Sequence, residues 1–373
     1  MRLTVFGPGY PFRGGIARTT TELVRELGSR GHEMLFLTPV HQYPRWLYPG
    51  ISDRDPEACP PLDVATAVLD PLDPLSWRRT RRCAEANRSD AWIMPYWTWA
   101  WAGLWRSLLT SSRRPPAVAV VHNPADHDAR IWQRLAARRV LGGCRGLFTH
   151  ASSLAEQLER DYPGVPVAHH PLPAVGEGTP EDRRTARRRL GLAEDRRVAL
   201  FVGLIRPYKG VDVLLEAAAG LPEGSDWLVV VAGEPWGRLG SELEQQAETL
   251  GLVDRVRLDL GWVPEDRLAD LMDAADLLVL PYRRGSQSAV APMGLARGVP
   301  VLATDVGGVP EVVKDGVNGV IVPPSDAAAI TAALEGLERD RLDGLAEGAR
   351  RSASMLRWPG YATAFEELLA EVV

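Results

Sequence analysis

The chain alternates short, continuously apolar segments with amphipathic ones, and this alternation runs twice along its length. Apolar segments separated by helical patterns indicate a parallel sheet that helices cover on both faces. The sequence therefore predicts an α/β protein of two doubly wound, Rossmann-like domains with a cleft between them. The predicted strands are 3–6, 34–37, 91–94, 117–121, 146–149 and 165–168 in the first run, and 198–202, 227–232, 256–258, 277–280, 301–303 and 320–322 in the second.

A stretch rich in proline and glycine, residues 171–180, separates the two runs. Such a composition is typical of a linker, and 373 residues is long for a single core. We predict an N-terminal domain over 1–174 and a C-terminal domain over 175–356. Ligands of such sheets bind at the carboxyl ends of the strands, so candidate site residues are sought there. Residues 39–63 give no clear pattern.

Net charge and cysteine content limit the partners and the cellular compartment that we expect for this protein. The formal net charge of −5 argues against a nucleic-acid partner. Three scattered cysteines without metal-ligand spacing favour a reduced, cytoplasmic protein. No signal region precedes the first predicted strand, and no apolar run approaches the ~20 residues that span a bilayer. The arginine clusters predict solvated helix faces, with peripheral contact at the inner membrane face as the alternative.

A diphosphate cradle is predicted directly after the strand at 198–202. The strand leads into Gly203, and Arg206 and Lys209 follow three residues apart, just before an apolar helix. Two cations beside a helix N-terminus favour the binding of a diphosphate, because the helix end adds partial positive charge. Lys209 is one of only two lysines, with Lys314, among 43 basic residues. The alternative is a solvated loop with two surface charges.

Two further loops supply candidate phosphate and sugar contacts. Gly14 and Gly15 open a predicted helix, where a backbone without side chains approaches a phosphate or sugar closely; a plain turn is the alternative. In the loop after 277–280, Ser286, Gln287 and Ser288 leave backbone N–H groups free for an anion or simply cap the next helix.

A glycine turn after the strand at 301–303 is followed by Glu311. Its carboxylate is placed to hydrogen-bond a sugar or ribose hydroxyl, or to favour a helix N-terminus. The carboxylate pair Asp126 and Asp128 is discounted as a metal site, because such short pairs arise often by chance. We therefore expect no metal site and no cofactor.

His122 closes the strand at 117–121, so its imidazole is expected to point into the cleft. The segment 91–105 holds five tryptophans, which usually indicates core packing. An aromatic platform for a sugar ring or a lipid tail is the alternative hypothesis, and its acceptor-binding candidates are Trp97, Trp99 and His127.

Together these motifs resemble those of the large retaining nucleotide-sugar glycosyltransferase family four, which has the two-domain GT-B fold. The resemblance covers nearly the whole chain. It implies that Arg206 and Lys209 neutralise a leaving diphosphate in place of a metal, that His122 lies near the reacting sugar, and that a helix near 357–373 crosses back to the first domain. The matching motifs are Gly14-Gly15, Arg30-Gly31-His32-Glu33, Gly203-x-x-Arg206-Pro207-x-Lys209-Gly210, Gly298-Val299-Pro300-Val301, Gly307-Gly308-x-Pro310-Glu311 and Asp315-Gly316-x-Asn318-Gly319.

One departure from the family pattern concerns its two glutamates, whose places fall on Gly285 and Met293. The sequence instead resembles a subgroup with Gln-Ser-Gly-Val there, which implies phosphate contacts from Gln287 and Ser288. The donor-binding candidates are Gly14, Gly15, Gly203, Glu234, Gln287, Ser288 and Glu311.

The resemblance implies retaining transfer of a sugar from a nucleotide-diphosphate sugar to a hydroxyl of a glycan, a lipid-linked sugar or a small molecule. The transition state resembles an oxocarbenium ion, so cations and helix N-termini at the leaving diphosphate favour it over the ground state. Two alternatives stay open: another GT-B enzyme, such as a nucleotide-sugar epimerase, and a non-catalytic nucleotide-sugar binding subunit, which the missing glutamates would favour.

Overall fold

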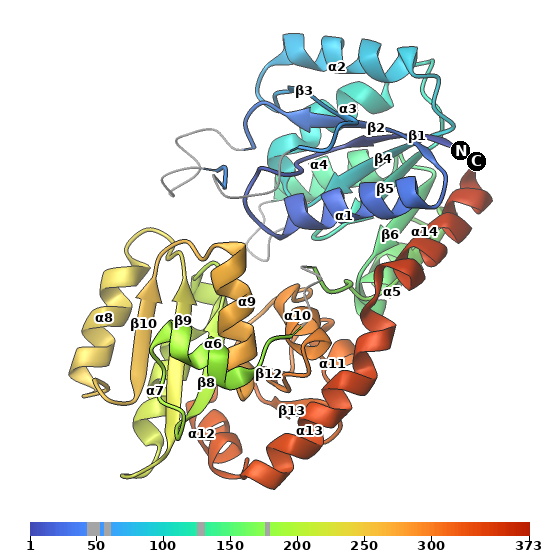
Figure 1. Ribbon diagram of the computed structural model, residues 1–373. Helices are drawn as coiled ribbons and strands as arrows, with labels where there is room; N and C mark the ends of the chain where they lie inside the picture. The colour runs from blue at the N-terminus through green and yellow to red at the C-terminus, as the bar shows by residue number, and fades with distance from the viewer. Residues whose placement is uncertain (43–52, 56–60, 125–130, 176–179) are drawn as a thin grey trace. The chain divides into compact units, whose positions relative to one another are not determined.

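The computed structural model describes residues 1–42, 53–55, 61–124, 131–175 and 180–373, and it divides the chain into two compact units (Figure 1). Unit 1 comprises Met1–Pro171 together with Trp358–Val373. Unit 2 comprises Leu172–Arg357. The chain thus starts and ends in unit 1, and each unit is described by itself.

Unit 1 is built on a parallel sheet of seven strands in the order β3-β2-β1-β4-β5-β6-β7. The order turns back at β1, as in doubly wound folds, and the inner strands β4 and β5 are buried at every residue. The strands are β1 (Arg2–Phe6), β2 (Glu33–Pro39), β3 (Ala65–Leu69), β4 (Ala91–Tyr96), β5 (Ala117–Val121), β6 (Gly146–Thr149) and β7 (Val167–His169).

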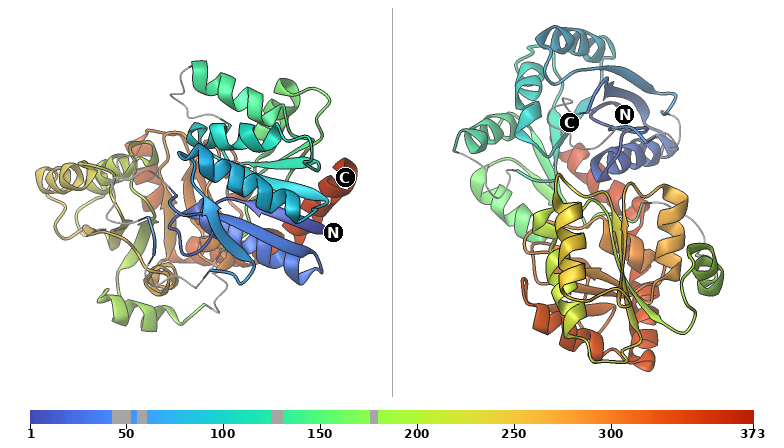
Figure 2. Two further views of the ribbon diagram at one scale, coloured as in Figure 1. Left: turned by 90° about the horizontal axis from the view of Figure 1, so that it is seen from above. Right: turned by 90° about the vertical axis from the view of Figure 1, so that its left-hand side faces the viewer.

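Two groups of helices cover this sheet. Helix α3 contacts both α2 and α4, whereas α14 contacts α1, β6 and β7. Figure 2 gives two further views of this arrangement. The helices are α1 (Gly15–Ser29), α2 (Pro74–Ala86), the 3-10 turn η1 (Trp99–Trp101), α3 (Ala102–Leu109), α4 (Ile131–Leu141), α5 (Ser152–Asp161) and α14 (Trp358–Val372).

The tryptophan-rich segment supplies the core of unit 1. Trp92, Trp101 and Trp105 are fully buried. Phe6 contacts Trp92 edge-on at 5.3 Å between ring centroids, and Trp101 lies 5.3 Å from Trp105. Core packing therefore explains these three indoles, and the hypothesis of an aromatic platform is wrong for them.

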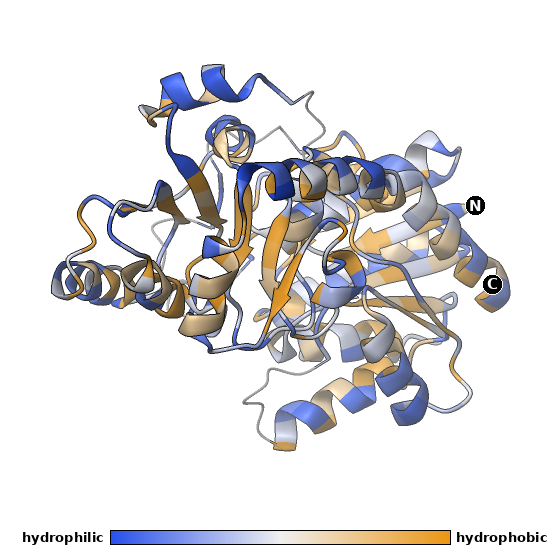
Figure 3. Cartoon of the chain, turned by 90° about the horizontal axis from the view of Figure 1, so that it is seen from below, coloured by the Kyte–Doolittle hydropathy of each residue, from blue (hydrophilic) through white to orange (hydrophobic). Residues whose placement is uncertain are grey.

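Unit 2 is built on a parallel sheet of six strands in the order β10-β9-β8-β11-β12-β13. The predicted doubly wound fold is confirmed in both units, and Figure 3 shows the hydrophobic character of the central strands. The elements are α6 (Arg183–Leu190), β8 (Arg197–Val202), η2 (Pro207–Lys209), α7 (Val211–Gly220), β9 (Trp227–Gly233), α8 (Leu239–Thr249), β10 (Val256–Leu260), α9 (Glu265–Ala274), β11 (Leu277–Leu280), α10 (Val290–Ala296), β12 (Val301–Thr304), α11 (Val309–Val312), β13 (Gly319–Val322), α12 (Ala327–Glu335), α13 (Arg339–Ser352) and η3 (Ala353–Leu356).

The structure adds one strand that the sequence did not predict. Strand β3 lies at the edge of its sheet, and its first three residues are not buried. An edge strand with exposed positions lacks the continuous apolar run that is typical of the inner strands. Within the described residues, no helix combines the length and the apolar character needed to cross a membrane.

Candidate functional site

The loop after β8 brings Lys209 back over Gly203. Gly203 has φ +124°, a conformation that residues with a side chain rarely adopt. A Cβ placed on it would lie 3.3 Å from Lys209 Nζ. The backbone N–H of Gly203 donates to Ala232 O of β9 at 3.0 Å, which fixes the turn at the carboxyl end of the sheet. The bare glycine therefore leaves room for the ammonium beside the strand end.

Arg206 and Lys209 lack counter-ions among the residues that the structure describes. Neither side chain has a hydrogen-bond or ion-pair partner there. The Arg206 guanidinium stacks on the Trp236 ring at 3.5 Å, and Lys209 Nζ lies 5.7 Å from the Tyr282 ring centroid. Burial, followed by repulsion from Arg206, lowers the pKa of Lys209 from 10.5 to about 8. Such an arrangement attracts an anion.

Backbone contacts tie the loop after β8 to the loop after β11. The N–H of Arg283 donates to Tyr208 O at 2.8 Å, and its guanidinium holds both oxygens of Asp212 at 2.6 Å. Gly210 has φ +67°, and a Cβ there would lie 2.0 Å from Pro281 O. Only glycine permits this approach, which accounts for Gly210 in the motif.

The loop after β11 is tied in turn to the loop after β12. The N–H of Gly308 donates to Ser286 O at 2.8 Å. Gly307 has φ +50°, and a Cβ on it would lie 2.1 Å from Gly285 O. Three loops at the carboxyl ends of β8, β11 and β12 thus form one connected surface.

Ser288 and Gln287 differ in what they contact. Ser288 Oγ accepts from the N–H groups of Val290 and Ala291 at 3.2 and 3.3 Å, so it caps α10. It also lies 3.3 Å from the Tyr282 hydroxyl. Gln287 Oε1 is buried and has no hydrogen-bond partner among the described residues. A buried acceptor oxygen without a partner is costly unless a ligand satisfies it.

Two donor-binding candidates with carboxylates flank this surface. Glu234 follows β9, and its backbone oxygen accepts from the N–H of Ile205 at 2.9 Å. Glu311 lies on α11, after the Gly307-Gly308 turn. At the two places of the family glutamates, Gly285 carries no side chain and Met293 packs against the core of unit 2.

In unit 1, His122 lies just beyond β5. Its N–H donates to Tyr96 O at 2.9 Å, and burial lowers the pKa of its imidazole to about 3. The ring lies 4.7 Å from that of His150, which itself stacks on Tyr361 of α14 at 5.7 Å. Sequence reasoning missed His150. The sequence pattern could have indicated it, because His122 directly follows β5 and His150 directly follows β6. These two strands are neighbours in the sheet, with Val121 opposite Thr149.

The N-terminal glycines lie at the start of α1. Gly14 is the N-cap residue, with φ +105° and no side-chain cap. A Cβ on it would meet no atom within 4 Å, so the backbone there faces open space. The first turn of α1 therefore leaves room for a ligand against its N–H groups.

The acceptor-binding candidates are only partly described. Trp97 is half-buried and packs on Trp101 at 4.8 Å. Trp99 is 36% exposed and contacts Trp132 edge-on at 4.8 Å. His127 lies outside the described residues, as do Asp126 and Asp128.

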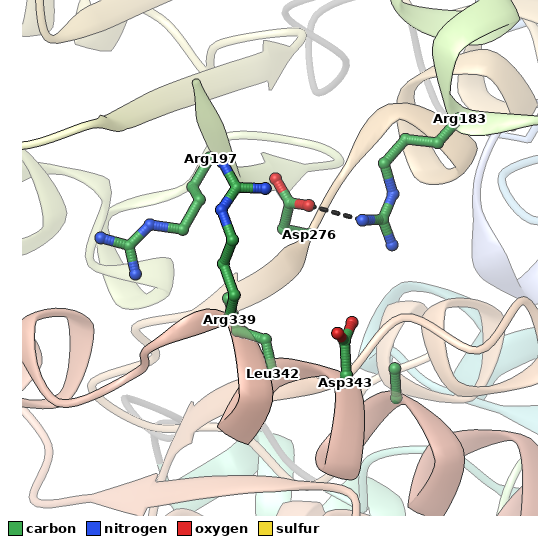
Figure 4. Close-up of a pocket in the computed structure, with 7 residues that line it drawn as sticks. Arg183, Arg197, Asp276, Arg339, Leu342 and Asp343 are labelled. Carbon is green, nitrogen blue, oxygen red and sulfur yellow. Dashed lines mark hydrogen bonds and ion pairs between the residues drawn. The ribbon is translucent and has the colours of Figure 1, made fainter. Parts of the chain in front are cut away.

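A cavity of about 50 Å³ in unit 2 is separate from this surface (Figure 4). Asp276, just before β11, binds Arg183 at 2.7 Å and Arg187 at 2.5 Å. Arg197 opens β8, so the cavity lies at the amino ends of the strands, opposite the edge where ligands of such sheets bind. Over the described ranges, no three His, Cys, Asp or Glu side chains cluster in a way that would hold a metal ion.

Comparisons with known proteins agree with this architecture. The family model Glycosyltransferase Family 4 matches residues 13–171, and the model Glycosyl transferases group 1 matches residues 182–353. A D-inositol 3-phosphate glycosyltransferase of Thermobispora bispora is 41% identical over 98% of this chain and 92% of its own. A D-inositol 3-phosphate glycosyltransferase of Geodermatophilus obscurus is 42% identical to this chain. The alignment covers 68% of this chain and 59% of that relative.

Among solved structures, the Anabaena protein HepE in complex with UDP-glucose superposes with a TM-score of 0.77 at 17% identity, covering 99% of both chains. The fold and its carboxyl-edge site define a GT-B glycosyltransferase. The chain belongs to glycosyltransferase family 4.

Proposed function

We propose that the enzyme transfers a sugar from a nucleotide-diphosphate sugar to an acceptor hydroxyl with retention of configuration and without a metal ion. The observation that carries the proposal is the pair of cations, Arg206 and Lys209, which have no counter-ion in the described chain. Their arrangement at a strand end fits the two phosphates of such a donor. UDP-glucose is the first donor to test, because HepE binds it on the same fold.

In the proposed reaction, the bond between the anomeric carbon and the diphosphate oxygen breaks, and that oxygen keeps the electron pair. Arg206 and Lys209 stabilise the charge that develops on the diphosphate, which favours the transition state over the bound donor. The acceptor oxygen bonds to the same face of the anomeric carbon, and its proton passes to the leaving diphosphate.

The remaining candidates bind the donor. Gln287 Oε1 accepts a hydrogen bond from the nucleotide-sugar, which satisfies a buried oxygen that has no partner among the described residues. Gly14 and Gly15 offer backbone N–H groups, and Glu234 and Glu311 accept hydroxyl hydrogen bonds. His122 stays neutral because burial depresses the pKa of its imidazole, so it contributes a hydrogen bond to the transferred sugar and not a charge.

The acceptor class is a hydroxyl compound, and D-inositol 3-phosphate is the first to test because it names the relatives' activity. Trp97, Trp99 and His127 are the proposed acceptor contacts. Glycans and lipid-linked sugars are the next classes to test.

The test compares Arg206→Ala and Lys209→Ala with Arg238→Ala, an exposed arginine of the same unit. Loss of one contact to a developing charge lowers kcat by about 10²-fold, so we expect this fall in the first two variants only. EDTA is expected to leave turnover unchanged, and NMR of the product is expected to show the donor's anomeric configuration. Turnover of Arg206→Ala near the wild-type rate would refute the diphosphate assignment.

A further inference from the structure

We propose that the outer face of α4 in unit 1 docks on an anionic lipid bilayer. This inference does not depend on the proposed transfer reaction. It starts from the apolar side chains of α4, which occupy both the inner and the outer face of the helix. Ala137, Val140 and Leu141 are buried, as expected for a surface helix, but Ile131, Trp132 and Leu135 are 80%, 47% and 45% exposed.

The exposed residues of α4 lie on one side of the helix. Ile131, Arg134, Leu135 and Arg138 follow the spacing i, i+3, i+4, i+7, which places them along one stripe. The neighbouring turn η1 contacts α4, and its Trp99 packs edge-on against Trp132 at 4.8 Å. The apolar surface therefore extends from α4 onto η1.

Arginines are interleaved with this apolar stripe. Arg134, Arg138 and Arg139 are all exposed, and none has an ion-pair partner in the described chain. The sequence from 91 to 155 holds eight arginines and only two acidic residues, Asp126 and Asp128. The net charge of the whole chain is nevertheless −5, so the positive charge is local to this part of unit 1.

A bilayer with anionic headgroups fits this combination better than an acidic protein. Aliphatic and indole side chains insert at the boundary between headgroups and acyl chains, while arginine heads stay at the phosphates above them. An acidic protein partner would satisfy the arginines but would leave an 80% exposed isoleucine with little to contact. The structure thus points to a peripheral, salt-sensitive attachment through α4.

The test is co-sedimentation of the full-length protein with vesicles of phosphatidylcholine alone or mixed with phosphatidylglycerol. We expect binding only to the mixed vesicles, and release at high salt. Each arginine near an anionic surface contributes roughly fivefold in affinity, so R134Q/R138Q/R139Q is expected to bind about 100-fold more weakly. The matched control R188Q/R350Q/R351Q, with three exposed arginines of unit 2, is expected to bind like the wild type.

The apolar contribution is tested by I131S/W132S, which removes two exposed side chains and leaves the core intact. We expect weaker vesicle binding with unchanged circular dichroism and thermal stability. Three results would overturn the proposal: no binding to mixed vesicles, equal binding by the α4 triple variant and the control, or a dimer in sedimentation velocity that I131S/W132S dissociates. The last result would assign the face to a second copy of the chain.

Discussion

Lys209 holds its ammonium against Gly203, so that a Cβ on the glycine would lie 3.3 Å from Nζ. The glycine at the end of β8 therefore does more than turn the chain, because it sets where the cation lies. Gly203→Ala is expected to displace the ammonium and to lower kcat by about tenfold or more, since small displacements of a charged group weaken transition-state stabilisation. It should also cost about 1–2 kcal/mol of stability through its positive φ.

The control for this prediction is Gly251→Ala, because Gly251 also has positive φ, +65°, but has open space where a Cβ would lie. It should lose about 1 kcal/mol of stability and keep full activity. Equal loss of kcat in both variants would show that general destabilisation, and not the position of Lys209, explains the effect.

The low pKa of Lys209 predicts an alkaline limit to activity. The ammonium is charged below its pKa of about 8 and neutral above it, so kcat/KM should fall as pH rises through that value. Lys209→Arg keeps its charge, and its profile should stay flat to higher pH even though its maximal rate is lower. A wild-type profile without a limb near the lysine pKa would contradict this prediction.

The same residue should reduce the stability of the unliganded protein. The pKa of Lys209 is lower in the folded chain, so between about 8 and 10.5 the unfolded chain binds more protons and stability rises with pH. Lys209→Met should therefore raise Tm at neutral pH, and its advantage should shrink as pH rises through this window. A diphosphate ligand should raise Tm in the wild type only.

Substitutions of Gln287 and Ser288 should have different effects, the first on donor binding and the second on the stability of the fold. Gln287→Ala removes a buried oxygen that has no partner in the described chain, so stability should be unchanged or higher while KM for the donor rises. Ser288→Ala removes the cap of α10 and should cost about 1 kcal/mol. Calorimetry and donor titration check both, and a clear loss of stability in Gln287→Ala would show that its side chain serves the fold.

Glu366 of α14 binds Arg30 and His32, with 2.8 Å to the imidazole. The Arg30 hydrogen bond, chiefly, lowers the pKa of Glu366 from 4.5 to about 2. The resulting stability is present above pH 4.5 and is lost as pH falls toward 2. Glu366→Gln should thus lower stability by roughly 1 kcal/mol at neutral pH, an upper value for exposed pairs, and should lack this acid-dependent loss.

The control for Glu366 is Glu347→Gln, which breaks an exposed pair with Arg351. Its effect should be close to zero at any pH. Urea titrations above and below the pKa window distinguish the two variants.

The sequence predicted the sheets well because the strands of a covered parallel sheet are apolar on both faces, as in 117–121 and 277–280. It missed β3, whose exposed positions break that pattern. It placed Arg206 and Lys209 at a strand end, but the lack of counter-ions for them within the described ranges depends on the tertiary structure. The sequence also could not show that Ser288 caps α10 while Gln287 Oε1 has no partner among the residues described, because this difference depends on side-chain orientation within one loop.

The return of α14 to unit 1 has a consequence for biosynthesis. Phe148 of β6 packs against Tyr361 and Phe365 of α14 at 5.0 and 5.1 Å. Until Trp358–Val373 have been synthesised and have left the ribosome, this part of unit 1 stays uncovered, whereas every residue of unit 2 precedes them in the chain. The unit encoded second is thus the first to be complete, and the nascent unit 1 must wait for α14 before it can mature.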